Sequence, residues 1–108
     1  MQCGGFCKTE LKTEHLTLVT TQQIEIEKRL IERGRNGKIE YFEILEVKQQ
    51  VVAGMNFIFK IKIQKDGEEC IFVKIFQDLQ TNVYLIDVHH NKSVSDELLM
   101  NEDFKQDT

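Results

Sequence analysis

The sequence predicts an α+β fold in which one long helix packs across a twisted antiparallel sheet of four to five strands. Apolar residues recur at helical spacing in residues 20–33, and an alternating pattern follows in residues 39–90. A helix with one apolar stripe and a sheet with one apolar face must bury each other. The length of 108 residues suits a single domain, so we expect residues 1–108 to form one.

The predicted helix follows a start of the chain that has no periodicity. Residues 1–10 are glycine-rich and are expected to form a flexible N-terminal trunk, and Leu11–Val19 is expected to be a short strand or a loop. The helix is predicted from Thr20 or Thr21, whose hydroxyl can cap its first turn, to about Arg33. Val19, Gln23, Ile26 and Leu30 fall at helical spacing, and Ile24 and Ile31 widen this stripe.

Four runs rich in apolar residues are predicted to be consecutive antiparallel strands. They are Ile39–Lys48, Met55–Gln64, Cys70–Phe76 and Tyr84–His90. Gly34 fits the C-cap of the helix, Asp66-Gly67 is a hairpin turn signal, and Asp78–Asn82 is a polar connection. The adjacent apolar pairs Tyr41-Phe42 and Ile44-Leu45 interrupt strict alternation, which predicts a β-bulge or partial burial on both faces.

Composition argues against several classes of partner. The net charge of −4 argues against nucleic acid and anionic membranes, which favour basic surfaces. No apolar run approaches the roughly 20 residues that a membrane-spanning helix needs. The N-terminus does not have the pattern of a secretory signal, so we expect a cytoplasmic protein.

The residues after the last predicted strand form a polar tail. Its apolar residues Leu98, Leu99 and Phe104 are candidates for anchoring the tail to the domain.

The cysteines do not form a disulfide framework or a metal motif. The chain has three cysteines, Cys3, Cys7 and Cys70. An odd number in a short chain is a poor basis for a disulfide framework, so we expect all three to be free thiols in a reducing compartment. A zinc site with His89 and His90 is the alternative, but adjacent histidines on a strand point to opposite faces. We therefore expect no metal and no cofactor.

The residues offer no convergent catalytic group, so we do not expect an enzyme. Histidine is the commonest general base, and the chain has only His15, His89 and His90. A Cys70–His89 pair is the alternative to consider, although Cys70 in a strand is typical of a small apolar core residue. Replacement of all cysteines would test that alternative.

The connection between the first two predicted strands is unusually apolar. It comprises Gln50, Val51, Val52, Ala53 and Gly54, whereas an ordinary exposed turn is built from polar residues. One interpretation is a strand that continues through the valines. The other is an exposed tip that inserts into the cleft of a partner, because connections between strands are where a scaffold presents functional residues.

The order of these motifs resembles the cystatin family, in particular the stefins, which are single-domain, disulfide-free intracellular members. Gln50-Val51-Val52-Ala53-Gly54 is similar to the family's first inhibitory loop, and Gly4-Gly5 matches the glycine of its N-terminal trunk. Further matches are Met55-Asn56-Phe57, Ile61-Lys62, Asp66-Gly67, Lys74-Ile75-Phe76-Gln77-Asp78-Leu79 and Asp96-Glu97-Leu98. The resemblance covers nearly the whole chain.

The second loop departs from the family pattern. Stefins usually carry Leu-Pro there, whereas this chain has Leu79-Gln80 and no proline at all. The connection to the last strand is also shorter. Proline lowers the entropy that a loop loses on ordering. Its absence therefore argues against a rigid second loop and against a full contribution of this loop to binding.

The resemblance implies a reversible, tight-binding inhibitor of papain-like cysteine proteases of the cathepsin L, B, H or S type. Gly4, Gly5, the loop from Gln50 to Gly54, Leu79 and Gln80 would bind the protease by filling its active-site cleft. The alternative is a non-inhibitory interaction protein with the cystatin fold, favoured by the altered second loop. The family also implies a monomer that can exchange its helix and adjoining strand to form a domain-swapped dimer.

Overall fold

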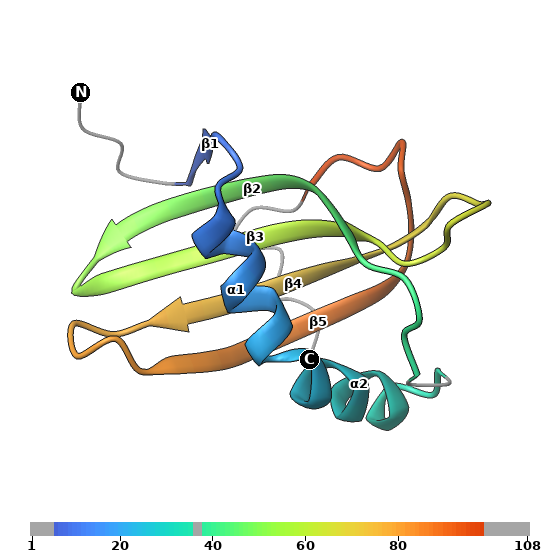
Figure 1. The fold of residues 1–108 in the computed structure, drawn as a ribbon, viewed down its shortest axis with the longest axis horizontal. Coiled ribbons are helices and arrows are strands. Elements are labelled where there is room, and N and C mark those ends of the chain that lie inside the picture. The colour runs from blue at the N-terminus through green and yellow to red at the C-terminus, as the bar shows by residue number, and fades with distance from the viewer. Residues whose placement is uncertain (1–5, 36–37, 99–108) are drawn as a thin grey trace.

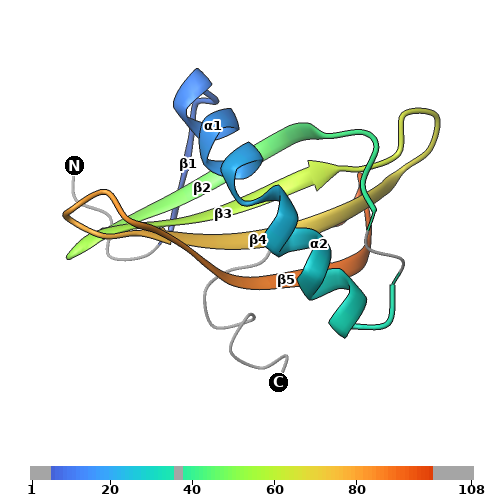
Figure 2. The same ribbon diagram turned by 60° about the horizontal axis from the view of Figure 1, so that its bottom comes forward.

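One antiparallel sheet and two helices make up residues 6–35 and 38–98, which are the residues that this computed structural model describes. The strands are β1 (Cys7–Thr9), β2 (Glu43–Val52), β3 (Gly54–Lys62), β4 (Glu69–Gln77) and β5 (Val83–Ser93), and they pair in that order. The helices α1 (Thr13–Thr21) and α2 (Gln23–Glu32) cover one face of the sheet (Figures 1 and 2). The predicted α+β class is confirmed.

The helical region begins earlier than predicted. The expectation of a strand or loop at Leu11–Val19 is wrong because α1 already starts at Thr13. The backbone N–H of Lys12 donates to Nδ1 of His15 at 3.0 Å. Burial lowers the pKa of His15, which favours the neutral ring that can accept this bond. A histidine in this role is not among the usual sequence signals for a helix start.

The predicted single helix is two helices because the chain leaves helical geometry at Gln22, where φ is −102° and ψ is 8°. The hydroxyls of Thr17, Thr20 and Thr21 donate to backbone carbonyls three or four residues earlier. Such bonds bend helices, and β-branched residues lower helix propensity. After the break, α2 packs along β5.

β2 and β3 form one long hairpin. Its register runs without a gap from Glu46 to Val52, and a shift between Ile44 and Glu46 confirms the predicted bulge. β2 ends at Val52 rather than at the predicted Lys48. The strand therefore continues through Val51 and Val52, which agrees with the interpretation of this segment as a continuing strand.

β1 was not predicted. Cys7–Thr9 pairs antiparallel with residues 47–49 of β2, so the expectation of a flexible trunk over residues 1–10 is wrong for this part. Three residues are too few to show a periodic pattern, and their partner lies far along the chain. Residues 1–5 lie outside the described part of the structure.

The main core lies between the helices and the sheet. It contains Leu18, Val19, Ile26 and Leu30 from the helices, Ile39, and Val47, Phe57, Phe59, Ile61, Ile63, Ile71, Val73, Ile75 and Val88 from the sheet and the residue that follows β3. Ile24 and Ile31, which were predicted to widen the helical stripe, are 67% and 63% exposed. A second cluster of Phe6, Ile58, Phe72 and Leu98 lies on the other face, which confirms Leu98 as an anchor.

The expectation of free thiols is correct for one cysteine and wrong for another. Cys70 is free and buried, and burial raises its pKa. Cys7 is disulfide-bonded. Cys3 lies outside the described residues, as do the other candidate anchors Leu99 and Phe104.

The described ranges contain neither a metal-binding cluster nor a membrane-spanning helix. No group of three or more His, Cys, Asp or Glu side chains in residues 6–35 and 38–98 is arranged to hold a metal ion. In the same ranges, no helix is long and apolar enough to span a membrane.

Candidate binding edge

The tip of the β2–β3 hairpin exposes apolar side chains. Val51 pairs with Met55 and Val52 with Gly54, so only Ala53 lies outside the ladder. Val51 is 72% exposed, and Val52 is 43% exposed. The segment is thus both a continuous strand pair and an exposed apolar tip.

Gly54 is required by its conformation and by its neighbours. Its φ is +114°, in the region that disfavours residues with a Cβ. A Cβ at this position would clash with the carbonyl oxygen of Gln77 and would crowd the ring of Phe76. Gly54 thus permits a turn with positive φ, and the glycine also lets the first hairpin approach β4.

Gln50 braces the hairpin just behind its tip. It lies directly across the ladder from Asn56, whose Nδ2 donates to Oε1 of Gln50 at 3.1 Å. Cross-strand pairs of this kind are the units that stabilise a hairpin. Gln50 is therefore a support for the exposed valines, in addition to any contact of its own.

The second loop is closed by the carboxylate of Asp78, which sequence reasoning missed. Oδ1 accepts hydrogen bonds from the backbone N–H groups of Gln80 at 2.9 Å and Asn82 at 2.8 Å. Oδ2 accepts from Nδ2 of Asn82 at 3.1 Å and from the hydroxyl of Tyr84 at 3.3 Å. An aspartate that bonds the backbone two residues on is typical of a turn, and that pattern was present in the sequence.

The backbone completes this closure. The N–H of Asp78 donates to the carbonyl of Asn82 at 2.9 Å, and the N–H of Thr81 donates to the carbonyl of Asp78 at 3.0 Å. Thr81 adopts a positive φ of 68°, which a loop held on several sides can maintain. The loop is ordered without proline, and Leu79 is 72% exposed on it.

The electrostatics of Asp78 favour its ionised form. Desolvation alone would raise its pKa, but the hydrogen bonds from Asn82, Gln80 and Tyr84 together lower the pKa below its ordinary value of 3.8. In turn, the negative charge of Asp78 raises the pKa of Tyr84, with smaller contributions from burial and from the hydrogen bond. Both groups keep the protonation states that hold the loop closed at neutral pH.

The two loops lie next to each other because β3 pairs with β4. Met55, which follows the first tip, is opposite Gln77, which precedes the second loop. The rings of Phe76 and Tyr84 stack behind the second loop, with their centroids 6.3 Å apart. We call residues 50–54 together with residues 78–82 the loop end, which is the left-hand end of the sheet in Figure 1.

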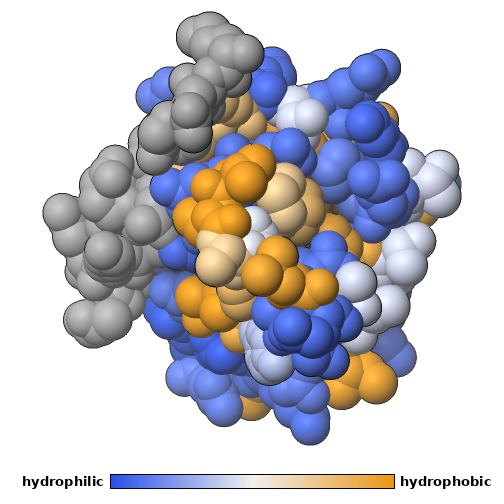
Figure 3. Space-filling model, turned by 90° about the vertical axis from the view of Figure 1, so that its left-hand side faces the viewer, coloured by the Kyte–Doolittle hydropathy of each residue, from blue (hydrophilic) through white to orange (hydrophobic). Residues whose placement is uncertain are grey.

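The loop end presents a partly apolar surface to solvent. Figure 3 views the molecule from this side and shows hydrophobic side chains gathered near the centre of the face, with hydrophilic ones around them. Val51, Val52 and Leu79 are the large exposed apolar residues of the two loops. An exposed apolar patch with a polar rim is typical of a surface that binds another protein.

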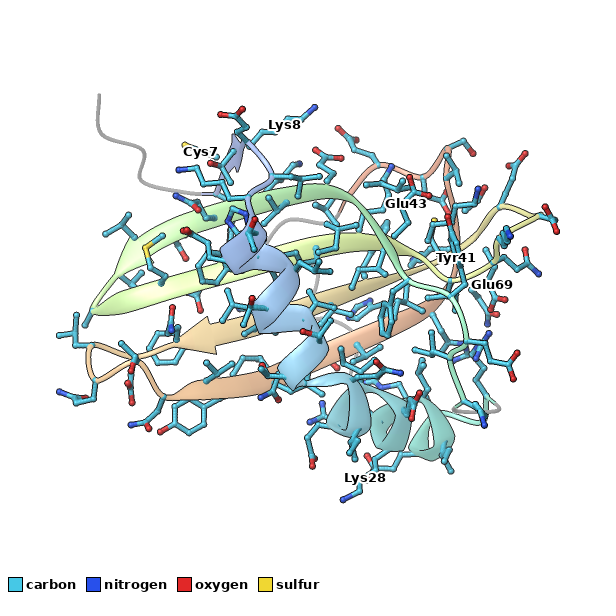
Figure 4. All side chains as sticks on the ribbon, viewed as in Figure 1. Cys7, Lys8, Lys28, Tyr41, Glu43 and Glu69 are labelled. Atoms are coloured by element: carbon cyan, nitrogen blue, oxygen red, sulfur yellow. The ribbon has the colours of Figure 1, made fainter. Side chains whose placement is uncertain are left out.

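The start of β1 lies toward the same end of the sheet. Cys7 is opposite Gln49 and Thr9 is opposite Val47, so the chain enters β1 from the side on which β2 reaches its tip. Figure 4 shows Cys7 and Lys8 on β1, beside β2. The predicted site residues Gly4 and Gly5 lie outside the described residues.

The candidate catalytic residues Cys70 and His89 lie on different rungs of one strand pair. Cys70 is opposite Lys92 in the β4–β5 ladder, and His89 is opposite Phe72. Burial raises the pKa of Cys70, which disfavours the nucleophilic thiolate. Nε2 of His89 lies 3.4 Å from Oδ2 of Asp87, so this ring nitrogen faces a carboxylate.

Comparison with known proteins gives a consistent family signal. The family model described as Cystatin domain matches residues 31–97. Cystatin-B of Bos taurus is 32% identical over 101 residues, which are 91% of this chain and 97% of the relative. Cystatin-A of Felis catus is 36% identical over 98 residues, or 88% and 94% of the two chains, and Stefin-3 of Mus musculus is 32% identical over 98 residues, or 88% of each.

Proposed function

The chain belongs to the cystatin family, and from that premise we propose that it is a reversible, tight-binding inhibitor of papain-like cysteine proteases. The observation that carries the proposal is the loop end, where an apolar hairpin tip and a polar loop that exposes Leu79 lie side by side. A narrow edge of this kind suits the active-site cleft of a protease. Inhibition then consists of excluding substrate, and no bond of the inhibitor has to break.

Binding energy in this proposal comes chiefly from apolar burial. Three apolar side chains are exposed in the free protein and would be buried away from water in the complex: Val51, Val52 and Leu79. Apolar surface removed from water contributes about 25 cal/mol per Å². Ala53 and Gly54 present little side chain, so the backbone of the tip can approach the wall of the cleft.

Both loops are ordered before binding, which lowers the entropy lost on association. The first is held by the ladder up to Val52 and by the bond between Asn56 and Gln50. The second is held by Asp78. The missing proline was the reason to consider a non-inhibitory protein, and Asp78 provides order by another route. We therefore propose that Leu79 and Gln80 contribute to binding.

The third element of the proposed interface is the trunk. Gly4 and Gly5 would let the backbone lie close against the protease where a Cβ would clash. The direction of β1 supports this assignment, because the chain enters that strand from the loop end. Proteases of the cathepsin L, B, H or S type are the proposed partners, and the cytoplasm is the proposed location.

We also propose a monomer as the basic inhibitory unit, with exchange of α1, α2 and the adjoining strands through an opened β2–β3 turn as a route to dimers. Short hinge loops under strain favour such exchange. Size-exclusion chromatography after mild heating, with reductant present, should then show a dimer peak. A strictly monomeric profile would contradict the exchange without affecting the inhibitory proposal.

Titration of active papain with the purified chain tests the proposal. The expected result is loss of activity in proportion to added protein, with full recovery of intact inhibitor after dissociation. A cathepsin-L-like enzyme should behave in the same way. Unchanged activity of both enzymes at micromolar inhibitor would contradict the proposed function, and a cleaved inhibitor would contradict the mechanism.

A further inference from the structure

We propose that Leu98 is a positioning residue for the N-terminal trunk and acts through Phe6; this inference rests on the proposed function. Phe6 comes directly before β1 and is 8% exposed. It shares one cluster with Ile58, Phe72 and Leu98, on the face of the sheet that the helices leave open. Phe6, which connects the trunk to β1, is thus buried in the same cluster as Leu98 of the segment that follows β5.

The segment that carries Leu98 is attached to the sheet by lysines. Nζ of Lys60 donates to the carbonyls of Val94 at 2.9 Å and Asp96 at 2.8 Å. Nζ of Lys48 donates to the carbonyl of Leu98 at 3.4 Å. These bonds run from β2 and β3 to the backbone of the segment, and they hold Leu98 in the second cluster with Ile58.

Phe6 has both apolar and cationic neighbours. Leu98 is 2% exposed and packs in its cluster, and Nζ of Lys74 lies 6.0 Å from the centroid of the Phe6 ring. A terminal segment is ordinarily poorly ordered unless something ties it down. β1 adds only the three residues Cys7–Thr9, and such a short edge strand is marginal by itself. The cluster therefore contributes to holding β1 in place, together with the disulfide of Cys7.

The cluster contains Phe6 and Leu98, from near the two ends of the described chain, and it does not lie at the loop end. Ile58 is opposite Lys48 and Lys74, in the body of the sheet, whereas the first tip lies at Val52 and Gly54. Leu98 therefore acts at a distance from the protease. Its role is to fix the point and direction from which the residues before Phe6 extend.

Inhibition constants for papain in a double-mutant design test this role. Leu98→Ala should weaken inhibition about tenfold, which corresponds to about 1.4 kcal/mol. In a Gly5→Glu background, where the trunk no longer docks, the same substitution should change the constant less than about twofold. An equal effect in both backgrounds would overturn the proposal, because Leu98 would then act on the fold as a whole.

Two further measurements separate positioning from general destabilisation. Val88→Ala, in the main core, should lower the melting temperature but leave the inhibition constant unchanged. Hydrogen exchange should be faster in Leu98→Ala at the amides of Cys7–Thr9 and unaltered in β4. Unchanged exchange in β1 would contradict the coupling. If the wild type does not inhibit, the proposed function fails and the exchange data still decide whether Leu98 holds β1.

Discussion

The carboxylate of Asp78 accepts a hydrogen bond from the backbone N–H of Asn82 at 2.8 Å, and this contact closes the loop on which Leu79 is exposed. The same side chain also accepts from Gln80 and Tyr84. A chain without proline thereby obtains an ordered second loop, and the contribution of Asp78 to that order can be measured.

Replacement of Asp78 should loosen the second loop and leave the rest of the fold intact. Asp78→Ala removes the acceptor for the N–H groups of Gln80 and Asn82, so their amides should exchange faster. Inhibition of papain should weaken by roughly 3- to 10-fold, because the loop must then be ordered during binding. Asp66→Ala, in an exposed turn of another hairpin, is the control and should change neither quantity.

The order of this loop should depend on acid in a defined window. The folded-state pKa of Asp78 is lower than its ordinary 3.8, so its contribution to stability is present above that ordinary value. The contribution is lost as pH falls through the lower, folded-state pKa. A titration of the Asp78 carboxyl by NMR should show the low midpoint, and Asn82→Ala should raise it. A midpoint at or above 3.8 would show that the hydrogen bonds are not made in solution.

The glycines at positive φ should differ in their tolerance of a methyl group. Gly34, at φ +88°, has no atom within 4 Å of the position that a Cβ would occupy, so Gly34→Ala should lower the free energy of unfolding by roughly 1–2 kcal/mol from backbone strain. Gly54→Ala adds a clash with the Gln77 carbonyl and should lower it by about 3 kcal/mol or more. Urea unfolding measures both. Equal effects would mean that the β2–β3 tip can move away from β4.

The ion pair between α2 and β5 should matter more than an exposed pair. Nη2 of Arg33 lies 2.6 Å from Oδ1 of Asp87, whose side chain is 12% exposed. Arg33→Ala removes the nearer of two arginines at that carboxylate, with Arg29 remaining at 3.7 Å, and should lower the free energy of unfolding by about 1–3 kcal/mol. Lys28, which points away from the sheet in Figure 4, pairs at 3.7 Å with Glu25 in solvent, and Lys28→Ala should lower it by about 0–0.5 kcal/mol. Comparable losses would contradict the difference in burial.

Much of the sheet could be predicted from local pattern alone. The apolar run Cys70–Phe76 located β4, which spans Glu69–Gln77, and the doubled apolar pair at Ile44-Leu45 located the bulge. β4 is buried on both faces, and a short apolar run between turn signals is visible without knowledge of the partner strands.

Features that depend on distant contacts could not be predicted in this way. β1 exists because Cys7–Thr9 meets residues 47–49, and α1 begins where it does because His15 reaches back to Lys12. The role of Asp78 had a local signal in the spacing to Gln80, but the contribution of Tyr84 emerges only when β5 returns beside β4. At the candidate site, the hairpin tip could be located from its composition. The contacts that support the tip, from Asn56 to Gln50 and from β4, could not be predicted.

The central claim, that the loop end enters the cleft of a cysteine protease, is tested most directly by comparing Val52→Asp with Ile31→Asp. Both residues are exposed and apolar, but Ile31 lies on α2. We expect Val52→Asp to raise the inhibition constant for papain by about 100-fold or more, since a charge would be buried without a partner. Ile31→Asp should leave it unchanged. Full inhibition by Val52→Asp would contradict the claim.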